Sequence, residues 1–177
     1  MTPRARNRLL LGLIAGLFLL PFGAAVVLRF GGWQPLHTRN HGELLSPPIE
    51  LVNVQGLRDD GSRWAWHNTE HEWTLLVRIP RRCEAACRDA LQPLPNVRQA
   101  LGRHAERLHL FCVGDAGAAT SLPSLRLQGR LPPPLAEPAA GELPELWLID
   151  PHGYLVMRYP PGFDAGGLRR DLSRLLR

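Results

Sequence analysis

The longest apolar run of the chain lies near its N-terminus. Residues 9–28 (LLLGLIAGLFLLPFGAAVVL) are twenty positions without a charged side chain. A helix of this length spans about 30 Å, the thickness of the hydrocarbon core of a bilayer. Arg4, Arg6 and Arg8 precede the run and no acidic residue does. The positive-inside rule therefore predicts a cytoplasmic N-terminus over 1–8, a transmembrane helix over 9–28, and the remaining chain across the membrane.

A cleaved signal peptide is the alternative interpretation of this run. Its apolar stretch would be shorter, and a small-residue cleavage site would follow it. The stretch GAAVVLRF has small residues but continues apolar, which favours an uncleaved anchor. The expected location is the bacterial inner membrane, with the soluble domain in the periplasm, where disulfides can form and persist.

Beyond the anchor, residues 29–48 are rich in turn-forming residues and predict a membrane-proximal linker. Shorter apolar patterns continue over 49–177 and predict one folded domain. Two β-friendly runs, 49–54 and 63–66, flank the Asp-Gly signal at 59–61 and predict a hairpin.

The rest of the domain alternates strand-length apolar runs with helical patterns. Strands are predicted at 73–79, 108–113, 146–149 and 154–159. Helices are predicted at 84–91, 96–107 and, with an apolar face, 165–176. A β-α-β unit followed by β-β-α is the thioredoxin arrangement. The predicted fold class is therefore α/β and thioredoxin-like, with an N-terminal β-hairpin, behind a single transmembrane helix.

Charge excludes one class of partner. The net charge of +5 comes from 21 basic residues, all of them arginine, against 16 acidic ones. No basic stripe interleaved with aromatic residues occurs, so nucleic-acid binding is not expected. The sequence also gives no reason to expect a small-molecule substrate.

The strongest candidates for chemistry are Cys83 and Cys87, in RIPRRCEAACRDAL directly after the strand 73–79. The first turn of a helix has unpaired N–H groups and a positive dipole end, which stabilise a thiolate and lower the pKa of its thiol. Cys83 is expected where this effect is largest, with Arg81 and Arg82 adding positive charge. On a helix both sulfurs would share a face. The pair could then form a disulfide, exchange with other thiols, or hold Cu(I).

An inert structural bridge is the competing interpretation of the two cysteines. A closed loop this short adds little entropic stabilisation, which argues against a purely structural staple. Pro144 supports the functional interpretation, because it directly precedes the strand predicted at 146–149. In thioredoxin folds a cis-proline occupies that place and faces the reactive cysteines, although the sequence does not show the isomer.

Other candidates are weaker. His67 and His71 have the i,i+4 spacing of a helical metal site, but their short segment between strands favours a solvated loop. His152, in an Asp-Pro-His-Gly turn, is expected at the end of its strand away from the cysteines. Cys112 lies within a strand and is expected to be a buried apolar filler.

Several of these motifs together resemble a known family. The stretches LVNVQGLRDDGSRWAW, WTLLVRIPRRCEAACRDAL and LWLIDPHGYLVMRYP resemble the Sco-type cytochrome oxidase assembly proteins in their hairpin, hydrophobic strand, C-x3-C motif and late Asp-Pro-x-Gly hairpin. TRNHGELL, the C-x3-C motif and LIDPHGYLVMRYP also resemble a group of small proteobacterial membrane proteins associated with cytochrome oxidase. The resemblance covers most of 38–177 and implies a membrane-anchored thioredoxin fold facing the periplasm.

The resemblance fails at the copper site. Sco proteins complete that site with a histidine shortly before the late strand. Here the place falls near Glu142, and no histidine lies between His109 and His152. The ligand set therefore carries over only to Cys83 and Cys87. A carboxylate is a poor Cu(I) ligand, so dithiol chemistry without copper is favoured over Cu(I) held by two thiolates and another group.

Two functions remain as hypotheses. The first is an accessory protein of cytochrome c oxidase biogenesis, resembling a thiol–disulfide oxidoreductase, with Cys83 as nucleophile, Cys87 as resolving thiol, and an oxidase subunit or another assembly factor as partner. The second is a non-catalytic scaffold beside the oxidase, in which the cysteine pair is inert. Its contacts would be the loops 131–138 (LPPPLAEP) and 37–44 (HTRNHGEL).

Overall fold

The structure is a computed structural model that describes residues 3–31, 40–114, 120–137, 139 and 141–177. The chain divides into two compact units, residues 1–39 and residues 40–177.

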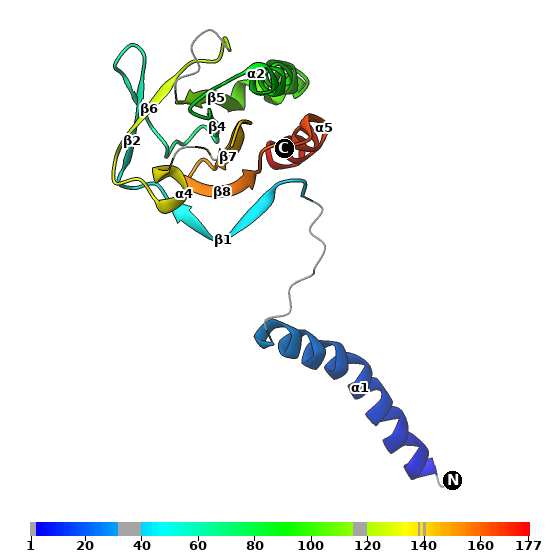
Figure 1. Ribbon diagram of the computed structural model, residues 1–177. Coiled ribbons are helices and arrows are strands. Elements are labelled where there is room, and N and C mark those ends of the chain that lie inside the picture. The colour runs from blue at the N-terminus through cyan, green and yellow to red at the C-terminus, as the bar shows by residue number, and fades with distance from the viewer. Residues whose placement is uncertain (1–2, 32–39, 115–119, 138, 140) are drawn as a thin grey trace. The chain divides into compact units, whose positions relative to one another are not determined.

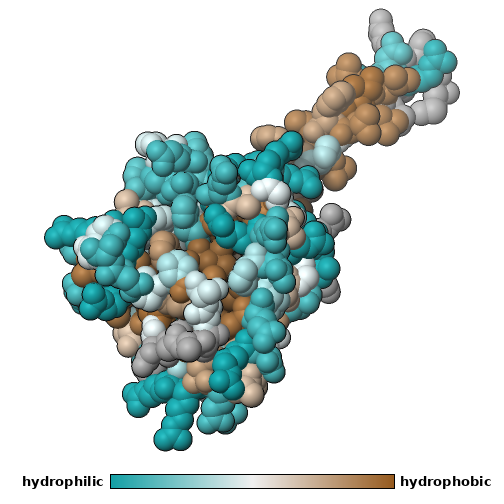
Figure 2. All heavy atoms as spheres, turned by 90° about the horizontal axis from the view of Figure 1, so that it is seen from above, coloured by the Kyte–Doolittle hydropathy of each residue, from teal (hydrophilic) through white to brown (hydrophobic). Residues whose placement is uncertain are grey.

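The first unit is a single helix, α1 (Pro3–Phe30), with Pro21 inside it. Its segment Arg6–Phe30 is long and apolar enough to cross a membrane. Large apolar side chains such as Leu17 and Phe18 are exposed around it, which Figure 2 shows as a hydrophobic surface. A helix that is apolar all round is suited to a lipid environment.

The second unit is built on a five-stranded sheet with the order β1-β8-β7-β4-β5. Its strands are β1 (Glu43–Glu50), β4 (Trp73–Arg78), β5 (Leu108–Val113), β7 (Glu145–Ile149) and β8 (Tyr154–Tyr159). Strands β4 and β5 are parallel, and all other neighbouring pairs are antiparallel. A smaller antiparallel sheet contains β2 (Val54–Arg58), β3 (Arg63–Trp64) and β6 (Leu125–Gly129).

Helices and the small sheet cover opposite faces of the large sheet (Figure 1). One face carries α2 (Ala85–Leu91), α3 (Pro93–Gln99) and α5 (Ala165–Leu175), and a 3-10 turn, η1 (Gly102–Arg107), leads into β5. The other face carries the small sheet and α4 (Pro133–Ala136). The order β4-α2-β5 and then β7-β8-α5 is the predicted β-α-β and β-β-α arrangement.

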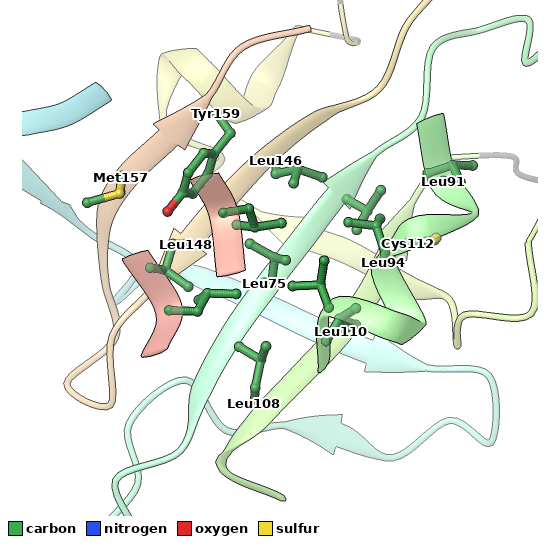
Figure 3. Packing of buried hydrophobic residues seen from close by; sticks show 14 of the residues in the cluster. Leu75, Leu91, Leu94, Leu108, Leu110, Cys112, Leu146, Leu148, Met157 and Tyr159 are labelled. Atoms are coloured by element: carbon green, nitrogen blue, oxygen red, sulfur yellow. The ribbon is translucent and has the colours of Figure 1, made fainter. Parts of the chain in front are cut away.

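Strand β4 belongs to both cores because its side chains alternate between the two faces. Leu75 and Val77 pack into the helix-side core, which Figure 3 shows between β4, β5, β7 and the helices. Leu76 packs into the core beneath the small sheet. All three side chains have no exposed surface, as expected for a central strand.

The N-terminal part of the domain differs from the prediction. The first strand of the hairpin is β2 (Val54–Arg58), not residues 49–54, because residues 49 and 50 belong to β1. Strand β1 begins at Glu43, inside the range predicted as linker; residues 32–39 of that range lie outside the described part of the chain. Prolines 47 and 48 weakened the strand signal. They are accommodated because β1 is an edge strand whose pairing with β8 shifts register there.

The helices after β4 also begin differently. Pro93 and Pro95 were expected to interrupt the helical pattern, with a helix resuming at 96. Instead they occupy the first turn of α3, where proline loses no helical hydrogen bond. The end of the pattern is the separate 3-10 turn η1.

Candidate functional site

The two cysteines lie directly after the central strand. Cys83 precedes α2 by two residues, and Cys87 lies in the first turn of that helix. Their sulfurs form a disulfide with an S–S distance of 2.03 Å and a Cα–Cα distance of 5.1 Å. The sequence predicted that both sulfurs lie on one face of a helix. This prediction is wrong, because residues 81–84 are not helical. The bend that leads from the strand into α2 brings the two cysteines together.

The two sulfur-bearing residues differ in exposure. Cys87 is completely buried in the helix-side core, whereas Cys83 is only partly buried at its edge. In thiol–disulfide exchange, access decides which sulfur is attacked. Cys83 is therefore the half of the bridge that another thiol can reach.

The surroundings of Cys83 favour a thiolate. The N-terminus of α2 has no side-chain cap at Glu84, and the first helical hydrogen bond runs from the N–H of Arg88 to the carbonyl of Glu84 over 3.1 Å. The uncapped first turn supplies N–H groups that can interact with negative charge. Arg81 and Arg82 are exposed next to the pair and carry charge of the same favourable sign.

Pro144 lies at the same edge of the sheet as the cysteines. Strand β7 runs antiparallel to β4 with Arg78 opposite Glu145, so Pro144, just before β7, is level with the end of β4. Pro144 is buried, and side-chain alternation puts it on the face of Leu146, in the core that contains Cys87. Its peptide bond is trans, because the cis bond among the described residues is Ser46–Pro47. Whether Pro144 takes part in the chemistry stays a prediction.

A buried ion pair, missed by the sequence analysis, lies on the other face of this edge. A guanidinium nitrogen of Arg78 is 2.7 Å from a carboxylate oxygen of Glu145, and each side chain is 6% exposed. Arg78 also donates to the carbonyl of Pro134, and Arg158 pairs with Glu145 at 3.0 Å. Burial lowers the pKa of Arg78, and the carboxylate of Glu145 opposes that effect. In the sequence, Arg78 within an otherwise apolar strand indicated that a buried charge needs a partner. The sequence did not show that this partner is Glu145.

A pocket of about 500 Å³ adjoins the cysteine-bearing turn. Ile79, Pro80 and Arg81 line it from the β4 side, and Gly114 lines it from the end of β5. The backbone of Pro80 pairs with that of Ala139, which lines the same pocket. A polypeptide that approaches Cys83 has this pocket beside it.

Cys83, Cys87 and Glu142 are not arranged as a Sco-type copper site. Among them, no group of three or more His, Cys, Asp or Glu side chains is placed to hold a metal ion. Glu142, which stands near the place of the Sco histidine, is exposed, and the sulfurs of Cys83 and Cys87 are bonded to each other. Sulfurs bonded to each other are not thiolate ligands, and whether Cys83 and Cys87 hold Cu(I) when reduced stays a prediction.

The remaining cysteine is part of the core, as predicted. Cys112 is 1% exposed in β5 and has a free thiol. Burial raises the pKa of this thiol to about 12, so it remains protonated at neutral pH. Cys112 is therefore an apolar filler and not a second reactive centre.

The structure also places the histidines that the sequence singled out. Residues 67–71 form no helix, and His71 has a positive φ of 59°, so His67 and His71 do not make the i,i+4 pair of a helical metal site. His152 lies at the far end of β7 from Pro144, as predicted, and is opposite His67.

The fold and the disulfide define a thioredoxin-like domain with a C-x3-C bridge after its central strand. The family described as transmembrane-like, thioredoxin-like, C-terminal domain matches residues 73–177, and the chain belongs to this family. The match confirms the predicted fold, and it begins at β4 and includes both cysteines. No curated protein matches the chain.

Solved structures with similar folds include two Sco proteins and a thioredoxin. ScoI of Arabidopsis thaliana, described with copper bound, is 17% identical, with 73% of this chain and 96% of that chain covered and a TM-score of 0.46. For apo Sco1 of Thermus thermophilus the values are 16%, 80%, 98% and 0.49. For the exposed lipoprotein thioredoxin Etrx1 of Streptococcus pneumoniae they are 14%, 70%, 99% and 0.45. Similarity at this level does not transfer a function.

Proposed function

We propose that this chain is a membrane-anchored, periplasm-facing thiol–disulfide exchange protein that assists cytochrome c oxidase biogenesis in the bacterial inner membrane. One observation carries the exchange chemistry: the Cys83–Cys87 bridge has one accessible and one buried half, at the end of the central strand of a thioredoxin-like domain. A labile bridge needs access on one side, and a resolving thiol needs protection from other partners.

The exchange reaction is balanced by the two cysteines and one substrate disulfide. In the reduced protein, the Cys83 thiolate attacks a sulfur of the substrate disulfide, forms a mixed disulfide and releases one substrate thiolate. The Cys87 thiolate then attacks the sulfur of Cys83 and releases the second substrate thiolate. The substrate gains two electrons, and the protein is left with the Cys83–Cys87 disulfide that the structure contains. The same steps in reverse oxidise a substrate dithiol.

The positive charge beside Cys83 supports this assignment. Arg81 and Arg82 are both exposed next to the bridge, and a positive field attracts an incoming thiolate and stabilises a thiolate that leaves. The pocket next to Pro80 and Arg81 offers room for the polypeptide that carries the substrate cysteines.

The oxidase context rests on the resemblance of the sequence to Sco-type assembly proteins. The expected partner is a cysteine pair on a cytochrome c oxidase subunit or on another assembly factor. The apolar helix α1, which could cross a membrane, would keep the domain near such a partner. Copper handling is not part of the proposal, because the third ligand that the Sco proteins use has no counterpart here.

A scaffold with a structural bridge is the second candidate, favoured by the complete burial of Cys87. Two contacts count against it. The predicted binding loop 131–138 contains α4, whose Leu135 is buried and whose Pro134 carbonyl accepts a hydrogen bond from Arg78. In the segment 37–44, residues 37–39 lie outside the described chain. The backbone N–H of His41 donates a hydrogen bond to the carboxylate of Asp171 in α5. Both loops thus have contacts within the domain itself.

The reduction potential of the Cys83–Cys87 pair distinguishes the two candidates. It should be measured on the full chain in detergent with Cys112→Ser, so that a single pair equilibrates with a glutathione or thioredoxin buffer. A potential above roughly −230 mV is expected for an exchange-competent pair. A potential below about −300 mV would identify a structural bridge and overturn the proposed exchange.

A further inference from the structure

Two exposed histidines face each other at the end of the domain opposite the cysteines. His67 and His152 occupy directly opposed positions of an isolated antiparallel bridge. The centroids of their imidazole rings are 6.1 Å apart, and the ring planes are inclined by 42°. The residues lie 85 positions apart in the sequence, so the fold and not a local motif brings them together.

The backbone around both histidines is fixed by hydrogen bonds. The N–H of His152 donates to a carboxylate oxygen of Asp150 over 3.0 Å, within the tight turn after β7. On the other side, the N–H of Asn68 donates to the carbonyl of Pro151 over 3.0 Å. Gly153 follows with a φ of 83°, a left-handed conformation that glycine adopts without strain. The backbone positions of the two histidines are therefore fixed before any ligand binds.

We propose that His67 and His152 form a binding site for a divalent transition-metal ion of the imidazole-preferring class, such as Zn²⁺ or Cu²⁺. Metal–nitrogen distances of about 2.0–2.1 Å place the centroids of two rings on one ion about 4.5–5.3 Å apart when the angle at the ion is about 90–110°. The observed 6.1 Å is about one ångström longer, and rotation about the side-chain bonds of two exposed residues can close that gap.

The surroundings leave room for further ligands of the ion. Both histidines line a pocket of about 470 Å³, together with Glu50, Trp64 and Trp66. Since no third His, Cys, Asp or Glu in the described chain completes a metal cluster here, water molecules fill the other coordination positions. Glu50, exposed at the rim of the pocket, can accept a hydrogen bond from such a water.

This site is separate from the disulfide. Thr74, at the start of β4, is opposite Ile149, whereas Arg78, at the end of β4, is opposite Glu145. The histidines adjoin the first of these ends and the cysteines adjoin the second, so strand β4 separates them by roughly 15–20 Å. Metal binding at the histidine pair therefore needs no free thiol and does not rest on the proposed exchange.

Zn²⁺ binding to the full chain in detergent tests the site, with the disulfide closed so that its sulfurs are not ligands. His67→Gln and His152→Gln are each expected to weaken the affinity roughly tenfold or more, because each variant loses the effective concentration of the second imidazole. The double variant should be little weaker than either single one, because the histidines act as a unit. His71→Asn is the matched control: asparagine tolerates the positive φ of 59°, and the affinity should not change.

Spectroscopy with one equivalent of Cu²⁺ gives a second readout. The paramagnetic resonance of the wild-type complex should show nitrogen couplings from two imidazoles, and either His→Gln variant should lose this pattern while far-UV circular dichroism confirms that it is folded. Unchanged affinity in both variants would overturn the site. A loss in His71→Asn equal to that in His67→Gln would overturn it in favour of the i,i+4 pair.

Discussion

The carboxylate of Asp171 in helix α5 accepts a hydrogen bond over 2.7 Å from the backbone N–H of His41, 130 residues earlier in the chain. The N–H of Gly42 donates to the same oxygen over 3.1 Å, and the hydroxyl of Tyr159 donates to it over 3.3 Å. Asp171 is 1% exposed. A single buried carboxylate thus joins the first described residues of the domain to its last helix and to β8.

Replacing this carboxylate should destabilise the domain strongly. In Asp171→Ala a buried backbone donor, a partly buried one and a buried hydroxyl lose their acceptor, which should lower the free energy of unfolding by about 3–5 kcal/mol. Asp171→Asn keeps one acceptor oxygen and should cost less. Urea denaturation of both variants measures the difference. A cost below about 1 kcal/mol for Asp171→Ala would show that water replaces the lost acceptor.

The packing of His41 against α5 gives a second prediction with an adjacent control. A Cβ at Gly167 would lie 2.6 Å from the imidazole of His41, whereas one at Gly166 would lie no closer than 3.4 Å to its nearest neighbour. Gly166→Ala should therefore be neutral or stabilise α5 by up to about 1 kcal/mol. Gly167→Ala should displace His41 and destabilise the domain by about 1–3 kcal/mol. Thermal unfolding of the two variants side by side checks the contrast, which equal melting temperatures would disprove.

The buried pair between Arg78 and Glu145 should behave differently when one partner or both are removed. Glu145→Leu leaves the Arg78 guanidinium buried without its carboxylate, a loss expected to cost about 3–5 kcal/mol. Adding Arg78→Met removes that charge and should recover a large part of the loss, because the partly exposed Arg158 still has Glu43 as a partner. A double-mutant cycle from urea denaturation measures the coupling. If the stability losses of the two single variants add up in the double variant, the two side chains contribute to stability independently of each other.

Several elements of the fold could be predicted from local sequence patterns, while the contacts between distant segments could not. Strands β4 and β5 are continuous apolar runs, and α5 has an apolar face, so each was found within two residues of its observed bounds. Strand β1 was missed because it contains two prolines and its partner β8 lies far along the chain.

The site shows the same division between local and distant information. The position of Cys83 and Cys87 after the central strand could be predicted because a strand signal, a proline and a helical pattern follow one another. The burial of Cys87, the partner of Arg78 and the meeting of His67 with His152 depend on strand register, which links residues far apart in the sequence. No local pattern contains that information.

The raised pKa of Cys112 predicts a loss of stability in alkali. The folded thiol has a pKa of about 12 against 9.0 for an unperturbed one, so above pH 9 the unfolded state binds fewer protons than the folded state. The stabilising contribution is complete below pH 9 and is lost as the pH rises toward 12, with a slope of about 1.4 kcal/mol per pH unit. Denaturation at stepwise higher pH should show a shallower decline for Cys112→Val than for the wild type. Parallel curves would exclude Cys112 as the source.

The asymmetry of the disulfide predicts which single-cysteine variant captures a partner. In Cys87→Ser the accessible Cys83 can still attack a substrate disulfide, but no thiol resolves the mixed disulfide, so a covalent complex should accumulate in cells. Cys83→Ser leaves only the buried Cys87 and should capture little. Non-reducing electrophoresis and mass spectrometry of membranes from cells that express each variant compare the two, with Cys112→Ser added to both.

The captured protein separates the two parts of the proposed function. A cytochrome c oxidase subunit or an assembly factor in the complex would support the oxidase context, whereas an unrelated protein would preserve the exchange chemistry and exclude that context. If Cys83→Ser captures as much as Cys87→Ser, the exposed sulfur is not the nucleophile. If neither variant captures a partner and an oxidase assay finds normal activity in cells with both cysteines replaced, the bridge is structural. Because attack requires access to a sulfur, the order of exposure, with Cys83 outside and Cys87 inside, predicts that Cys87→Ser captures more partner than Cys83→Ser.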